Sequence, residues 1–113
     1  MTQACVTMLA LVSLFFMSLR ANRKFVHESR LPMQWSLSGA VNWTAPRFWA
    51  LAFTPMLSAI ILAGTTIASF TIAPRPGQAD EVIPVITAMS LCFIMVHALH
   101  LWLIGRTVRA RGN

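Results

Sequence analysis

The sequence predicts an all-α integral membrane protein with three transmembrane helices, and three observations lead to this fold class. Apolar residues make up 57% of the 113 residues and charged residues only 11%, whereas a soluble domain carries about 25% charged residues. Three stretches contain no charged residue, namely residues 1–19, 48–74 and 82–105. Each stretch is long enough to cross a bilayer core of about 30 Å, which takes roughly 20 apolar helical residues.

Each charge-free stretch is expected to be helical, because every backbone amide and carbonyl inside lipid needs an internal hydrogen-bond partner. The expected spans are about 2–19, 48–72 and 82–104, within one membrane domain that covers residues 1–113. The first four residues contain no basic side chain, and no small-residue cleavage site is evident. We therefore interpret the first span as an anchor rather than as a cleaved signal peptide.

The second helix carries sequence signals at its start and in its interior. Thr44 is expected to cap this helix, with Pro46 in the first turn, where a missing amide hydrogen costs little. Pro55 lies inside the helix. It is expected to kink the helix unless a neighbouring group satisfies the carbonyl that the proline leaves free.

The third helix follows a segment that cannot be helical. Residues 73–77 read APRPG and are expected to connect the second span with the third. Asp80 and Glu81 then open the third helix, where the helix dipole favours negative charge. Pro84 falls in the first turn of this helix.

The basic residues are distributed unevenly around the spans. Eight of the nine lie between the first two spans or after the third, and only Arg75 lies in the other connection. Because basic loops stay on the cytoplasmic side, we expect a cytoplasmic loop 20–47, a cytoplasmic C-terminus and an outward-facing N-terminus in the plasma (inner) membrane. The net charge of +6 then reflects topology and attraction to the anionic headgroups of the lipid bilayer. No nucleic-acid partner is expected, because no nucleic-acid-binding motif accompanies the charge.

The loop 20–47 carries aromatic and apolar residues besides its basic ones. Tryptophan prefers the headgroup zone of a membrane, so two interpretations are open. The loop is either a rigid element folded onto the membrane surface or a connector anchored by its aromatic side chains. Pro32 restricts its own backbone and biases Leu31 toward an extended conformation, and Gly39 can adopt a positive φ.

The sequence LPMQWSLSGAVNWTAPR, residues 31–47, resembles the signature loop of the domain of unknown function found in SdpI-type immunity proteins. In that family the loop lies between the first two transmembrane helices and combines a proline, a histidine, an aromatic residue and a glycine. The matching positions are Pro32, Trp35, Gly39, Trp43 and Arg47. Gln34 stands at the usual histidine position, so a role that needs a titratable or metal-binding group is not expected there. The resemblance covers about residues 3–70 and implies a toxin-immunity or signalling function.

The third span contains two histidines, and histidine inside a span is uncommon and often functional. His97 shares a helix face with Thr87, Ser90, Ile94 and Leu101. His100 lies about 60° further round the helix. Three roles are open for these histidines: axial ligation of haem or a chlorophyll-type pigment, contact with a proton path or a quinone headgroup, or an interhelical hydrogen bond.

The second span is rich in small residues. Ala59 with Ala63, and Gly64 with Ala68, are each four positions apart, a spacing that allows close backbone approach between helices. Three helices leave little area for mutual packing. We therefore expect a membrane protein partner or a homo-oligomer.

Catalytic and metal-binding signatures are absent from the sequence. No nucleophile–base arrangement, phosphate loop or zinc signature occurs, so the chain is not expected to be an enzyme and no metal site is expected. The first hypothesis is a small accessory or immunity-like membrane protein that docks onto another membrane protein. The alternative is a redox, quinone- or pigment-binding membrane subunit that uses His97. A transporter fragment is a third hypothesis, although no intramembrane charge is present to bind an ion.

Overall fold

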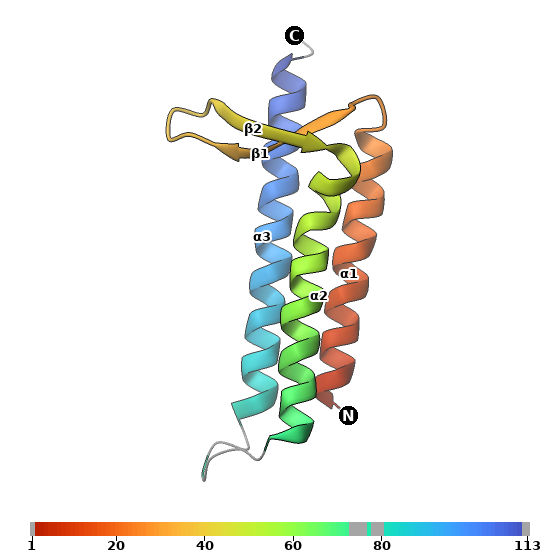
Figure 1. Ribbon diagram of the computed structural model, residues 1–113, viewed down its shortest axis with the longest axis vertical. Coiled ribbons are helices and arrows are strands. Elements are labelled where there is room, and N and C mark those ends of the chain that lie inside the picture. The colour runs from red at the N-terminus through yellow and green to blue at the C-terminus, as the bar shows by residue number, and fades with distance from the viewer. Residues whose placement is uncertain (1, 73–76, 78–80, 112–113) are drawn as a thin grey trace.

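Three long helices stand side by side in the computed structural model, which describes residues 2–72, 77 and 81–111 (Figure 1). The helices are α1 (Thr2–Lys24), α2 (Arg47–Thr71) and α3 (Val82–Arg111). Each is long and apolar enough to cross a membrane. The expectation of a mostly helical, multi-pass membrane protein is therefore confirmed. α1 and α3 continue beyond the expected spans into the basic segments that follow them.

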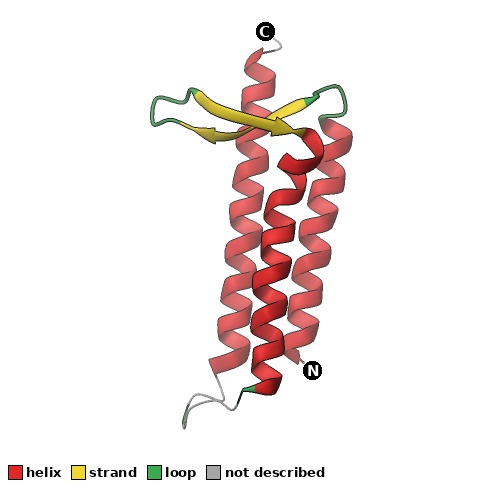
Figure 2. Ribbon diagram, viewed as in Figure 1, coloured by secondary structure: helices red, strands yellow, loops and turns green. Residues whose placement is uncertain are grey.

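The segment between α1 and α2 forms a β-hairpin, which we did not predict from the sequence. Its strands, β1 (Arg30–Trp35) and β2 (Val41–Pro46), pair antiparallel and lie across one end of the helices (Figure 2). Leu31 stands opposite Ala45, and both side chains are buried. The pairing is irregular on both sides of Gln34. The hairpin is therefore a folded element packed onto the helices; its placement against a membrane surface stays a prediction.

The start of α2 differs from the expectation. Thr44 lies in β2, where its hydroxyl accepts a hydrogen bond of 2.9 Å from Nε of Arg30. Pro46 is the N-cap residue, with no side-chain cap, and Arg47 is the first helical residue. The predicted capping role of Thr44 is thus wrong, because strand pairing holds this residue in an extended conformation.

The start of α3 agrees with the expectation in the described residues. The helix begins at Val82, so Pro84 lies in its first turn, and Glu81 directly precedes it. The predicted connection 73–77, apart from Gly77, and the predicted role of Asp80 lie outside the described residues.

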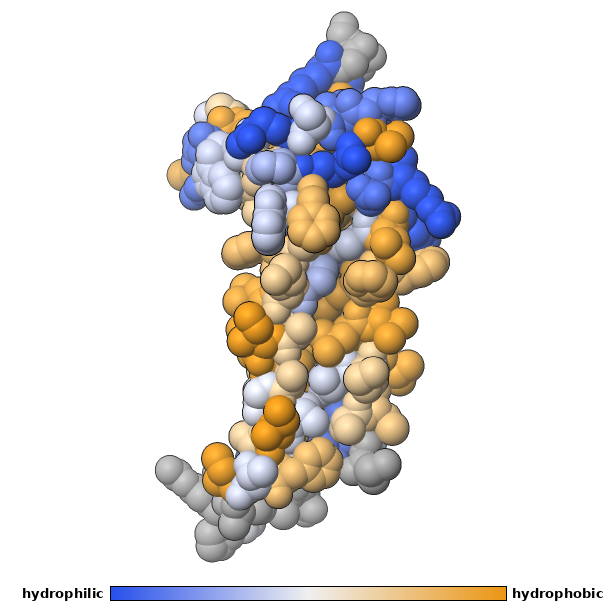
Figure 3. Space-filling view, turned by 45° about the vertical axis from the view of Figure 1, so that its right-hand side comes forward, coloured by the Kyte–Doolittle hydropathy of each residue, from blue (hydrophilic) through white to orange (hydrophobic). Residues whose placement is uncertain are grey.

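The two ends of the bundle differ in character. The start of α1 lies with the end of α2 and the start of α3 at one end, whereas the hairpin and the end of α3 share the other (Figure 1). We call the latter the hairpin end. Figure 3 shows hydrophilic residues gathered at the hairpin end and hydrophobic residues along the helices. Loop 20–47 and the end of α3 thus share one end of the molecule, as the spans require.

The main apolar core also lies at the hairpin end, where the hairpin packs against α2 and α3 beside the end of α1. It consists of Ala21, Phe25, Leu31, Ala45, Ala50, Leu51 and Ile104. Many large apolar side chains along the rest of the helices point outward. Such a surface is suited to lipid, because lipid tails are as apolar as the side chains themselves.

Candidate functional site

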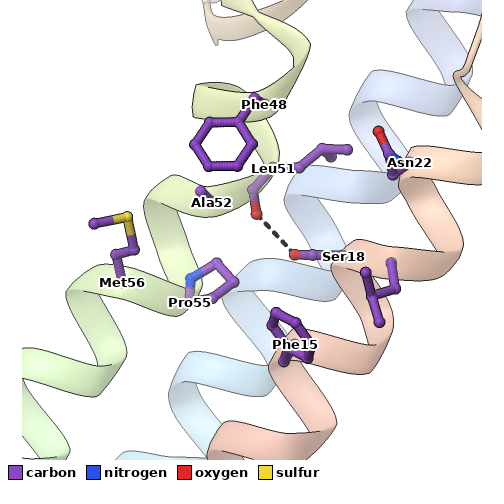
Figure 4. A pocket seen from close by; sticks show the side chains of 9 residues that line it. Phe15, Ser18, Asn22, Phe48, Leu51, Ala52, Pro55 and Met56 are labelled. Atoms are coloured by element: carbon purple, nitrogen blue, oxygen red, sulfur yellow. Dashed lines mark hydrogen bonds between the residues drawn. The ribbon is translucent and has the colours of Figure 1, made fainter.

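A hydrogen bond between helices compensates the proline in α2. Pro55 has no amide hydrogen, so the carbonyl of Leu51, four residues earlier, loses its partner within the helix. The hydroxyl of Ser18 on α1 donates to that carbonyl over 2.7 Å (Figure 4). Both Ser18 and Pro55 line a pocket of about 450 Å³ between α1 and α2. The neighbouring helix thus supplies the partner that Pro55 removes.

The same serine connects α1 with α3. Oγ of Ser18 lies 2.8 Å from Nε2 of His97. Because the single hydroxyl hydrogen is used at the Leu51 carbonyl, Oγ must accept the hydrogen of Nε2. This arrangement fixes the neutral tautomer of His97 with its hydrogen on Nε2. Nδ1 has no hydrogen-bond partner within the described part of the chain.

His97 lies in the interior of the three-helix bundle. Its side chain is 0% exposed, and Ser90, on the face predicted for His97, is also buried. The hydroxyls of Ser58 and Ser90 have no partner among residues 2–72, 77 and 81–111. Towards the other end of the bundle, the hydroxyls of Thr7 and Thr66 join α1 to α2 over 2.6 Å. The interior therefore carries polar side chains at several depths.

Among the proposed histidine roles, the structure shows an interhelical hydrogen bond for His97. A flat macrocycle on His97 would require the helices to separate at this depth, because the imidazole has no exposed surface.

His100 lies directly beneath the hairpin. Its Nε2 is 3.4 Å from the carbonyl oxygen of Pro32, and its ring meets that of Trp35 edge to face, with centroids 5.9 Å apart. Nε1 of Trp35 donates to the hydroxyl of Thr107 over 3.0 Å. The structure thus brings the loop motif and the third helix together, a contact that we did not predict from the sequence.

The remaining motif residues shape the hairpin itself. Nε1 of Trp43 donates to Oε1 of Gln34, its cross-strand neighbour, over 2.9 Å. Gly39 has a φ of +90° in the turn between the strands, a conformation that favours glycine. Leu37, in the same turn, is fully exposed. The side-chain amide of Gln34 therefore has a structural partner within the hairpin.

Arg47 holds the turn between α1 and β1. Its Nη1 donates to the carbonyls of Val26 and Glu28 over 2.6 and 2.8 Å. Its Nε donates to Oδ1 of Asn22 over 2.8 Å. The backbone amide of Arg47 donates to the carbonyl of Ser29 over 3.0 Å. One side chain thus joins the end of α1, the turn and the start of α2.

The small residues of α2 lie away from its buried face. That face consists of Ala50, Leu51, Thr54, Ser58, Leu62 and Thr66. In contrast, Ala59, Ala63 and Ala68 are half-buried, and Gly64 is exposed. A Cβ atom added at Gly64 would meet nothing within 4 Å. Packing of these small residues against a further helix remains a prediction.

Comparison with known proteins finds no matching family model, curated protein or solved structure. The contacts therefore have to be interpreted from this chain alone. Three residues that form hydrogen bonds at the site were not predicted from the sequence: Ser18, Asn22 and Thr107. For Ser18 a signal existed, since Pro55 requires an external donor for the Leu51 carbonyl. No comparable signal pointed to the other two.

Proposed function

We propose that this chain is a small accessory membrane protein that docks onto another membrane protein through its hairpin. The hairpin end faces the cytoplasm, because eight of the nine basic residues flank the spans on that side. The membrane is the plasma (inner) membrane, and the N-terminus faces outward. The similarity of residues 31–47 to the loop of SdpI-type proteins supports an immunity or signalling role.

The exposed apolar tip of an anchored hairpin is the observation that carries this proposal. Arg47 at the base of the hairpin contacts Asn22 of α1 and Trp35, at the end of β1 next to the turn, contacts Thr107 of α3, while Leu37 in the turn is fully exposed. The turn around Leu37 is itself ordered by hydrogen bonds, since the amides of Ser36 and Gly39 donate to the carbonyls of Ala40 and Ser36. A leucine held in a fixed position at a surface is a suitable anchor for a partner's apolar pocket.

The outward face of α2 supports the proposal independently. Gly64 is exposed and a Cβ atom there would meet nothing within 4 Å, so the surface is low at this position, between the exposed side chains of Ile60 and Ile67. Small residues let a second helix approach closely, and close packing drives association in lipid. Docking through the hairpin would place a partner's transmembrane helix within reach of α2.

Site-specific photocrosslinking in native membranes tests the proposal. A photoreactive amino acid at position 37 should give a covalent adduct with one defined membrane protein. The same group at position 12 is the control, because Val12 is also exposed and apolar but lies in the helical part of the bundle. The same partner should co-purify with the unmodified chain and be lost from the Leu37→Ser variant. Recovery of lipid adducts alone, or of a second copy of this chain, contradicts docking onto another protein.

A further inference from the structure

A groove between α1 and α3 at the hairpin end combines basic and apolar side chains. Its volume is about 420 Å³. Its lining includes Arg20, Lys24, Met17, Ala98, Leu101 and Trp102. Lys24 lies two helical turns closer to the hairpin than Met17. The groove is therefore basic towards the hairpin and apolar towards the middle of the bundle.

Lys24, at the basic edge of this groove, lies close to a second cation, Arg109 of α3. Nζ of Lys24 and Nη1 of Arg109 lie 3.5 and 3.7 Å from the point that a Cβ atom of residue 105 would occupy. Gly105 is buried, and because it has no side chain, the two cationic groups can lie close to this point. In the part of the chain that the structure describes, neither cation forms an ion pair. Two like charges at short range repel each other, so an anion at this point would relieve the repulsion.

The aromatic residues at the groove mark the depth of a headgroup. Trp102 lines the groove, and the guanidinium carbon of Arg106 lies 5.6 Å from the centre of its indole ring. Tryptophan concentrates at the boundary between lipid tails and water. Along the helices, the groove changes from charged to apolar as a phospholipid does. The charged groups lie on the hairpin side of the indole, and the apolar surface lies on the side of the bundle centre.

We propose that this groove binds one anionic phospholipid, whose phosphate lies between Lys24 and Arg109. The upper part of an acyl chain then lies against Met17 and Ala98. Basic pockets between transmembrane helices on the cytoplasmic side are known to bind anionic headgroups. This site is separate from the hairpin tip, and its occupancy does not depend on a protein partner.

Native mass spectrometry of the full chain in detergent tests the proposal directly. The chain is titrated with dioleoylphosphatidylglycerol and, separately, with dioleoylphosphatidylcholine, which has the same tails and no net charge. One phosphatidylglycerol should be retained, with a preference of roughly tenfold or more, since each contacting basic residue contributes about fivefold. The Lys24→Gln/Arg109→Gln variant should lose most of this preference. Full retention of the preference by that variant overturns the proposal.

The matched control removes two charges from the same helices outside the groove. Arg23 and Arg111 are exposed, do not line the groove and are not among the atoms nearest to the Cβ position of residue 105, as Lys24 and Arg109 are. The Arg23→Gln/Arg111→Gln variant should keep the preference for phosphatidylglycerol. If both double variants lose this preference equally, net charge alone attracts the lipid. That result overturns the proposed lipid site in the groove.

A variant that keeps every charge tests the apolar part. Ala98 is exposed in the groove, so Ala98→Phe fills the space for the acyl chain and should lower retention of phosphatidylglycerol severalfold. This measurement stands even if the double charge variant fails to fold. Excess inorganic phosphate should not displace the lipid from the unmodified chain. Displacement by phosphate would assign a simple anion site and contradict a lipid site.

Discussion

Ser18 on α1 donates its hydroxyl hydrogen to the backbone carbonyl of Leu51 on α2, the carbonyl that Pro55 leaves without a partner. The bond links a sequence feature of one helix to a side chain of another. An unpaired carbonyl in lipid costs more than in water, because no solvent can replace the missing donor. The pair therefore fixes the depth of α1 relative to α2.

Replacement of Ser18 by alanine should destabilise the fold by about 1–2 kcal/mol, since it removes two interhelical hydrogen bonds and leaves the Leu51 carbonyl unpaired. In the Pro55→Ala background the cost should fall, because the new amide at position 55 satisfies the same carbonyl. Reversible unfolding in mixed micelles, followed by circular dichroism, measures both values and their coupling.

Ser13→Ala is the matched control for the double-mutant cycle of Ser18 and Pro55. The hydroxyl of Ser13 bonds to the carbonyl of Leu9 within the same helix, at an exposed position. Its loss should change stability by less than about 0.5 kcal/mol. Equal costs for the Ser13 and Ser18 variants, or an unchanged Ser18 cost without Pro55, would show that the interhelical bond does not stabilise the bundle.

The Ser18 contact also predicts the tautomer of His97. Nitrogen NMR of the selectively labelled chain in micelles should show a protonated Nε2 and an unprotonated Nδ1, because Ser18 has one hydrogen and uses it at Leu51. In the Ser18→Ala variant, both neutral tautomers of His97, with the hydrogen on Nε2 or on Nδ1, should be populated. A proton on Nδ1 in the unmodified chain would reverse the direction of the hydrogen bond and contradict this network.

The helices could be predicted from the sequence because charge is excluded from lipid. The charge-free stretches located the helices of the structure, and the helix period placed His97 and Ser90 on one face, where the structure shows both to be buried. Pro55 indicated that a carbonyl would need an outside partner. These inferences depend on composition and local geometry alone, so one sequence was sufficient.

The hairpin could not be predicted in the same way. At the membrane surface water can satisfy a backbone group, so a segment such as residues 30–46 is not restricted to helix. The link from Trp35 to Thr107 joins residues far apart in the sequence and depends on how α1, α2 and α3 pack. Thr44 illustrates the resulting error, because its sequence position suits a helix cap and its strand partner was unknown.

Arg47→Lys should loosen the turn between α1 and β1. Lysine has one compact cationic group and cannot reach Asn22, Val26 and Glu28 in the same fixed geometry as a guanidinium. The free energy needed to open the turn locally should fall by about 1.5–3 kcal/mol, the range found for hydrogen bonds made by charged groups. Hydrogen exchange of the turn and β1 amides should accelerate by about tenfold or more.

Arg23→Lys is the control for Arg47, because Arg23 is exposed at the end of α1. Exchange in the turn should stay unchanged in this variant. Equal exchange in the Arg47→Lys variant and the unmodified chain would show that the side chain of Arg47 does not hold the turn.

Two glycines should respond to the same substitution with opposite signs. A Cβ atom at Gly39 or at Gly64 meets nothing within 4 Å, so only the backbone conformation differs. Gly39 has a φ of +90°, and alanine there should destabilise the hairpin by about 1–2 kcal/mol. Gly64 is in the interior of α2, and alanine there should stabilise the isolated chain by about 0.5–1 kcal/mol.

Urea-dependent hydrogen exchange for the hairpin and unfolding in micelles for the helices measure the two effects separately. The bulkier Gly64→Leu variant adds a test of the outward face of α2. It should leave the isolated chain folded, since the position is open, yet reduce association with a partner that packs there, because close approach requires a small residue. If Gly64→Leu keeps full co-purification of the protein captured at position 37, α2 is not part of the docking surface and the hairpin acts alone.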